Sequence, residues 1–178
     1  MPPNPSDPAV RDVVAAIDCA FPLDGATLSG TRVLFDSDGP GLTPDRPSSW
    51  REVAERINEV DSSLIGSLEP DDFRYYLPGL LTGCLLHLRE GAPPYEGSVL
   101  FGLVWGNDDR YWDDRFLDRW GRLPPQQLDA VERAVDLLLP EPAPEHRERL
   151  YALLGPSDRT RAKETLDLLR IRQALGGD

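Results

Sequence analysis

The sequence predicts a mainly α-helical protein, a single compact multi-helix domain with at most a small β element. Several stretches repeat apolar residues every three or four positions, the spacing of one helix face. Most of these stretches begin with a capping residue or a proline. A chain of 178 residues buries about 70% of its unfolded surface, enough for one core. We expect a disordered arm over 1–7, a helical core over 8–139 and a C-terminal helical pair over 140–178, packed on the same domain.

The first helix is expected from residue 8 to about residue 20. Asp7 can cap its N-terminus, and Pro8 suits its first position because that backbone nitrogen needs no hydrogen bond. After it, residues 31–35 combine β-branched and aromatic side chains and predict a short strand. Residues 36–48 hold three prolines and two glycines and predict a long loop.

A second helix is expected over 49–60, and the third is expected from Pro70 to about residue 88. Ser49 and Glu52 have the spacing of a capping box. The third helix is apolar almost all round, which is typical of a central helix. Pro78 inside it predicts a kink, and the glycines at 79 and 83 would let another element approach closely.

The apolar run over 98–104 fits either a buried strand or a helix, and the flanking glycines favour a strand. Later proline and apolar patterns predict three more helices. These helices are expected over 124–139, 143–154 and 158–174.

Two segments resemble a bacterial domain family of unknown function. The first is the run FRYYLP over Phe73–Pro78, which matches an "aromatic, Arg, aromatic, aromatic, Leu-Pro" signature on the family's central helix. The second is LPPQQ over 123–127, which matches a Leu-x-Pro-x-Gln segment opening another helix. The resemblance spans about residues 9–139. It implies the helical core and brings no activity with it.

The charge excludes several classes of partner. The chain carries 31 acidic and 19 basic residues, a net charge of −12. A protein with this charge repels a nucleic acid or an anionic membrane, because both are negatively charged. The last helix is locally +2, which leaves −14 on the rest. Eighteen arginines against one lysine are typical of a GC-rich bacterial genome. With neither a secretory signal nor an apolar run long enough to span a bilayer, we expect a cytoplasmic protein.

Familiar catalytic patterns are absent from the sequence. There is no phosphate-binding glycine loop, nucleophile elbow or paired-cysteine zinc motif. His87 falls on the apolar side of the third helix, where a core imidazole is expected, and His146 falls in the first turn of a later helix. Cys84 is expected in the core and Cys19 on the surface. These absences disfavour the familiar nucleotide and hydrolase chemistries, and we expect no cofactor.

The segment 105–120 is the main candidate for a functional site. If it is helical from about residue 109, Asp109 lies above Asp113, Asp114 lies above Asp118, and Trp112, Phe116 and Trp120 share a second stripe. Such a surface suits guanidinium or ammonium groups, because carboxylates and ring faces both attract them. An acidic, solvated face over aromatic residues packed in the core explains the same pattern, and a Mg²⁺ or Ca²⁺ site is a third interpretation.

The candidate binding residues are those of this segment together with Arg74 of the signature. They are Asp109, Trp112, Asp113, Asp114, Phe116 and Arg74. Arg74 also has a structural interpretation, as an ion-pair partner of Asp71 or Asp72 whose stem covers apolar surface.

We expect a non-enzymatic interaction protein that binds a basic protein partner, as small acidic immunity or scaffold proteins do. The alternative is a metal-dependent hydrolase that uses the carboxylates of 108–118. A third possibility is a structural subunit of a larger assembly. An exposed apolar patch around Leu168 and Ile171 would favour that possibility.

Overall fold

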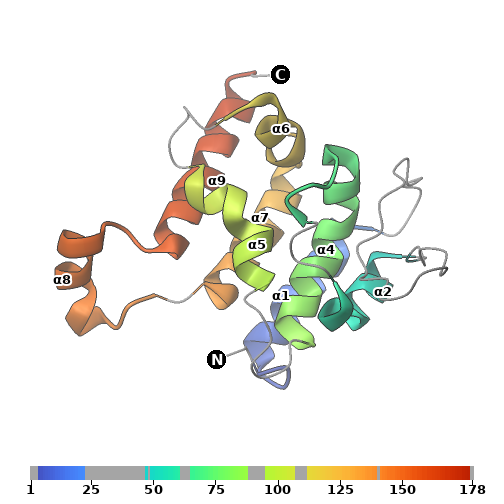
Figure 1. Ribbon diagram of the computed structural model, residues 1–178, viewed down its shortest axis with the longest axis horizontal. Helices are drawn as coiled ribbons and strands as arrows, with labels where there is room; N and C mark the ends of the chain where they lie inside the picture. Colours follow the sequence, from blue (N-terminus) through green and yellow to red (C-terminus); the bar gives the residue numbers. More distant parts are fainter. Residues whose placement is uncertain are drawn as a thin grey trace, which may run out of the picture.

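The computed structural model describes residues 4–22, 47, 49–60, 65–87, 95–106, 112–139 and 141–176. No strand occurs in these ranges, and the predicted mainly α class is confirmed. Figure 1 shows α4 beside α1 and α2, α5 and α7 at the centre, and α9 on the far side of α5. The helices are α1 Pro8–Ala20, α2 Trp50–Glu55, α4 Pro70–Leu86, α5 Tyr95–Trp105, α6 Asp114–Phe116, α7 Pro125–Leu138, α8 Pro144–Leu154 and α9 Asp158–Ala174. The predicted strand over 31–35 lies outside the described residues, as does the predicted loop over 36–48 except for Pro47.

Helix α1 has the predicted bounds and the predicted cap. The carboxylate of Asp7 accepts a hydrogen bond from the backbone N–H of Ala9 at 2.9 Å, and Pro8 occupies the first position. Its buried side chains face α4 and α7. They are Val10, Val13, Ile17 and Ala20.

The helix predicted over 49–60 is shorter than expected. Its α-helical part ends at Glu55, and a 3₁₀ turn follows over Ile57–Glu59. Its N-terminus is as predicted, because Ser49 Oγ accepts a hydrogen bond from the backbone N–H of Glu52 at 3.4 Å. Arg56 also pairs with Glu52 and Glu59, which holds the final turn in its tighter form.

The two glycines of α4 have the predicted role. A Cβ at Gly79 would collide with the backbone carbonyl of Trp50, and a Cβ at Gly83 would lie 2.7 Å from Ile57 Cβ. Real Cβ atoms do not approach other atoms so closely, so only glycine lets α2 and the 3₁₀ turn lie directly on α4.

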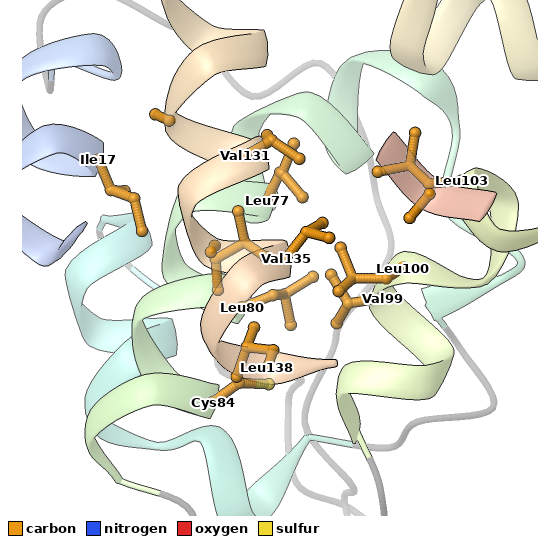
Figure 2. Packing of buried hydrophobic residues seen from close by; sticks show 14 of the residues in the cluster. Ile17, Leu77, Leu80, Cys84, Val99, Leu100, Leu103, Val131, Val135 and Leu138 are labelled. Atoms are coloured by element: carbon orange, nitrogen blue, oxygen red, sulfur yellow. The ribbon is translucent and has the colours of Figure 1, made fainter. Parts of the chain in front are cut away.

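The core lies between α4, α5 and α7, and Figure 2 shows their side chains meeting there. Leu77 and Leu80 of α4 face Val131 and Val135 of α7, and Leu100 of α5 lies at their edge. All five side chains are fully buried. Helix α4 is central, as its apolar composition predicts, because it is covered by helices on most of its surface.

The strand predicted over 98–104 is wrong. These residues belong to α5, which begins at Tyr95 and continues to Trp105. A buried strand and a buried helix can both have a continuous apolar sequence, so the pattern alone does not distinguish them and the packing decides. Here Val99, Leu100, Leu103 and Val104 are buried, while Phe101 is 61% exposed, which is one side of a helix and not an alternating strand.

The C-terminal helices have the predicted bounds but differ in how they pack. Helix α9 packs against α5 and α7, where Thr165 Oγ1 donates a hydrogen bond to the carbonyl oxygen of Leu103 at 2.7 Å. Arg170 of α9 also pairs with Asp129 and Glu132 of α7. Helix α8 projects away from the other helices at the left of Figure 1.

Candidate protein-binding site

The structure places Arg74 and the 112–118 segment at one junction. This junction joins the N-terminal part of α4, the turn over 65–69 that precedes it, and α6 with the π-helical turn Leu117–Gly121 that follows it. We name it the arginine junction, after the guanidinium groups that cross it. They belong to Arg74, Arg115 and Arg119.

The helix in this segment begins later than residue 109. Trp112 and Asp113 are not helical, and α6 begins at Asp114. Asp113 is its cap, with one carboxylate oxygen accepting a hydrogen bond from the backbone N–H of Phe116 at 2.7 Å. Asp113, expected at a helical position, is therefore the cap residue after which the helix begins. Asp109 lies outside the described residues.

The aromatic side chains of the segment pack inward. Trp112 is half-buried, stacks on Phe116 with ring centroids 5.5 Å apart, and donates from Nε1 to the carbonyl oxygen of Gly106 at 2.6 Å. Phe116 is buried, as is Trp120, which makes an edge contact with Phe73. The rings therefore stabilise the junction, and only Trp112 keeps part of its surface in solvent.

Two arginines of the segment bind backbone carbonyls. Arg115 donates to the carbonyl oxygen of Leu68 at 2.9 Å, and Arg119 donates to the carbonyl oxygens of Leu68 and Gly66. Arg119 also lies over the ring of Phe73, 4.9 Å from its centroid. Burial, reinforced by the charge of Arg115, lowers the pKa of Arg119 to about 10.

Arg74 makes the connection from the other side. Its guanidinium donates to the carbonyl oxygen of Asp118 and forms an ion pair with Asp71. Sequence reasoning treated Arg74 and the acidic segment as separate candidates, and it gave no role to Arg115 or Arg119. Their i,i+4 spacing was the available signal, because it puts two guanidinium groups on one side of a helical turn.

The carboxylates of the segment differ in how far they are compensated. Asp118 forms an ion pair with Arg122. Asp113 and Asp114 are exposed, and neither forms an ion pair with any described residue. Glu69 is also exposed at this junction, and its charge acts on Arg119 in the direction that raises the pKa of Arg119. The junction therefore exposes carboxylates that have no ion-pair partner among the described residues, even though three arginines cross it.

The described residues contain no cluster suited to a metal ion, since no three His, Cys, Asp or Glu side chains converge. The expectation that His87 lies in the core is wrong: α4 ends at Leu86, and His87 is an exposed cap residue whose carbonyl accepts from Asn58 Nδ2 at 2.8 Å. His146 is exposed on α8. Cys84 is buried and Cys19 exposed, as expected.

Comparisons with known proteins bring no relative. No family model, no curated protein and no solved structure matches the chain. The resemblance to a family with the FRYYLP signature therefore stays a prediction. In the described part of the chain, no helix has the length and apolar content needed to cross a membrane.

Proposed function

We propose that this chain is a non-enzymatic interaction protein that binds a basic protein partner at the acidic surface of the arginine junction, as an immunity or scaffold protein does. One observation carries the proposal. Arg115 and Arg119 donate to the carbonyls of Gly66 and Leu68, and Asp113 and Asp114 keep exposed carboxylates without an ion-pair partner in the described structure. Arg115 and Arg119 thus donate to the backbone and form no ion pair with these aspartates, although the charge of Asp113 does act on Arg119.

The overall charge supports the same proposal. All of the net charge of −12 lies in residues 1–140, which hold 24 acidic and 12 basic side chains. A field of this sign accelerates the approach of a basic protein and repels nucleic acids and anionic membranes. We also propose a cytoplasmic location.

The geometry of the junction also suits a recognition surface. Asp113 is held by its hydrogen bond to Phe116 N, and the segment is held on α4 by the hydrogen bond from Arg74. A charge on a fixed backbone loses little conformational freedom when it pairs with a partner's guanidinium. Trp112 adds a partly exposed ring beside these carboxylates, where an arginine of the partner can stack.

The test uses the purified full chain with the basic proteins encoded by adjacent genes, and poly-arginine as a general polycation. The variant carries Asp113→Asn and Asp114→Asn, because asparagine keeps the helix cap while removing the charge. We expect the association rate to fall by about 2- to 10-fold and the salt dependence to become shallower.

The matched control carries Asp12→Asn and Glu55→Gln. These residues are exposed on α1 and α2, which lie apart from α6 in Figure 1, and the variant has the same net charge as the test variant. Equal losses in the two variants would show that only total charge matters. Unchanged binding and salt dependence in the Asp113/Asp114 variant would refute the proposal.

A further inference from the structure

The C-terminal helices expose an unusual share of the large apolar side chains. Among the described residues, six such side chains are exposed; four of them lie on α8 and α9, and a fifth directly follows α9. Leu153 and Leu154 of α8 are 70% and 73% exposed. On α9, the exposed side chains are Leu168 and Ile171, and Leu175 is the cap residue that follows the helix. Isolated exposed leucines are common in monomers, but several on one side of a helix are typical of an interaction surface.

Helix α9 has two apolar faces. One face carries Ala162, Leu166 and Leu169 and is buried against the domain. The other carries the three exposed residues at 168, 171 and 175, which are three and four positions apart. This is the spacing of a seam that packs against another helix. Nothing in the described chain covers this second face, since Ile171 and Leu175 are 54% and 82% exposed.

Helix α8 does not cover the exposed face of α9 in the same chain, because a cluster of polar side chains fixes the direction of α8. Tyr151 donates to Glu141 at 2.9 Å, Ser157 donates to the same carboxylate at 2.5 Å, and the Tyr151 and Thr160 hydroxyls lie 3.0 Å apart. Gly155 makes the turn between the helices with a positive φ of 80°. The result is the projecting α8 of Figure 1.

The local charge indicates which occupant suits these surfaces. Residues 141–178 contain seven acidic and seven basic side chains, so this segment is neutral while residues 1–140 carry −12. A neutral surface gives a basic protein no electrostatic advantage. For two copies of this chain it is the favourable place to meet, because contact there keeps the acidic bodies apart.

We propose that two copies of the chain associate through the C-terminal helical pair, with α8 of each copy on the outer face of α9 of the other. A two-fold axis makes the contact reciprocal, so both exposed groups of both copies are covered at once. Leu153 and Leu154 of one copy pack against Leu168, Ile171 and Leu175 of its partner. The proposal concerns a surface other than the arginine junction and does not depend on the proposed function.

The test is the mass of the full chain in solution, measured by sedimentation from about 1 μM to about 1 mM, a range that covers moderate and weak dimers. We expect a dimer that added salt leaves unchanged or strengthens, because salt screens the repulsion between acidic bodies. Binding of a basic partner at the junction must instead weaken with salt, so failure of one proposal is distinguishable from failure of the other. A monomer throughout this range overturns the dimer.

Three single substitutions locate the contact. Ile171→Glu and Leu154→Glu are each expected to raise the dimer Kd by about tenfold or more, while Ala15→Glu, on the exposed side of α1, leaves it unchanged. Circular dichroism checks that each variant folds. A chain with both Leu154→Lys and Ile171→Glu should regain association relative to either single change, since the two positions face each other across the dimer. Unchanged Kd in the single variants, or no recovery in the double variant, refutes the arrangement.

Discussion

Arg74 donates a hydrogen bond to the backbone carbonyl oxygen of Asp118, a residue 44 positions later in the chain. The same guanidinium pairs with Asp71 one turn before it on α4. One side chain therefore stabilises the start of the central helix and attaches the acidic segment to it. The two contacts use two different nitrogens of the guanidinium, whereas a lysine carries all three of its donors on a single nitrogen.

Replacing Arg74 by lysine should therefore destabilise the protein although the charge is kept. We expect the free energy of unfolding to fall by about 1–2 kcal/mol, because one of the two acceptors loses its donor. Arg122→Lys is the control, since Arg122 is 65% exposed and its pair with Asp118 should contribute less than about 1 kcal/mol. Chemical denaturation measures the free energy of unfolding of both variants. Equal losses in the two would contradict the claim that Arg74 stabilises the protein through two separate contacts.

Alanine at the two glycines of α4 should be destabilising, against the usual helix preference. Alanine gains up to about 1 kcal/mol over glycine in a helix, but overpacking costs about 1–3 kcal/mol. Gly79→Ala should be the worse change, because its Cβ meets the backbone of Trp50, which cannot rotate away. At Gly83 the Cβ meets the side chain of Ile57 at 2.7 Å.

Gly121→Ala is the matched control for these glycines. A Cβ there would have its closest neighbour, Leu117 Cδ2, at an ordinary 3.5 Å. Its unfolding midpoint in urea should stay close to that of the unmodified chain. If all three alanine variants behaved alike, close contact between α2 and α4 would not be the reason for the glycines.

Thr165→Val tests the attachment of α9 to α5. The substitution keeps the volume of a fully buried side chain but removes the hydroxyl that donates to Leu103 O at 2.7 Å. We expect a loss of about 1–2 kcal/mol in thermal or chemical unfolding, because a buried hydrogen bond is lost without a cavity being formed. A variant as stable as the unmodified protein would show that this bond contributes nothing.

The ion pairs between α7 and α9 should make stability depend on pH. Burial opposes the ionisation of Glu132, but hydrogen bonds and attraction from Arg170 and Lys163 outweigh it, so its pKa is lowered. A carboxylate with a lowered folded pKa stabilises the protein above its unfolded pKa, about 4.3, and loses this contribution as the pH falls through the folded value.

Glu132→Gln measures this contribution. At pH 7 this variant should have a lower free energy of unfolding than the unmodified chain. The difference should be below about 1 kcal/mol, because the group is partly exposed, and it should vanish in acid. Asp12→Asn, at an exposed position on α1, should show no comparable trend. A difference that grew on acidification would have the wrong sign for this explanation.

The sequence predicts helices well where local chemistry decides them. Asp7, Pro8 and the Pro124–Pro125 pair begin α1 and α7 as expected, since caps and prolines act within one turn. The role of Gly79 is also evident from sequence, because a glycine pair on an apolar helix has few other uses. The error over 98–104 arises because complete burial removes the alternation that distinguishes strand from helix.

The candidate site was only partly predictable. Sequence patterns single out Arg74 and the acidic segment, but their meeting depends on the packing of the π-helical turn Leu117–Gly121 on α4, a contact between distant parts of the chain. Arg115 and Arg119 were missed as structural residues because their acceptors are backbone carbonyls, which carry no sequence signature. The exposure of Leu153 and Leu154 was likewise not evident, since an apolar residue on a short helix is expected to pack on its own domain.

The bonds from Arg115 and Arg119 to Leu68 and Gly66 end on peptide oxygens, which do not take up protons in mildly acidic solution. Both acceptors belong to the main chain, so they keep their hydrogen-bonding capacity whatever side chain stands at positions 66 and 68. Substitution can therefore abolish these contacts only at the two arginines, which alone carry the sequence requirement of the attachment.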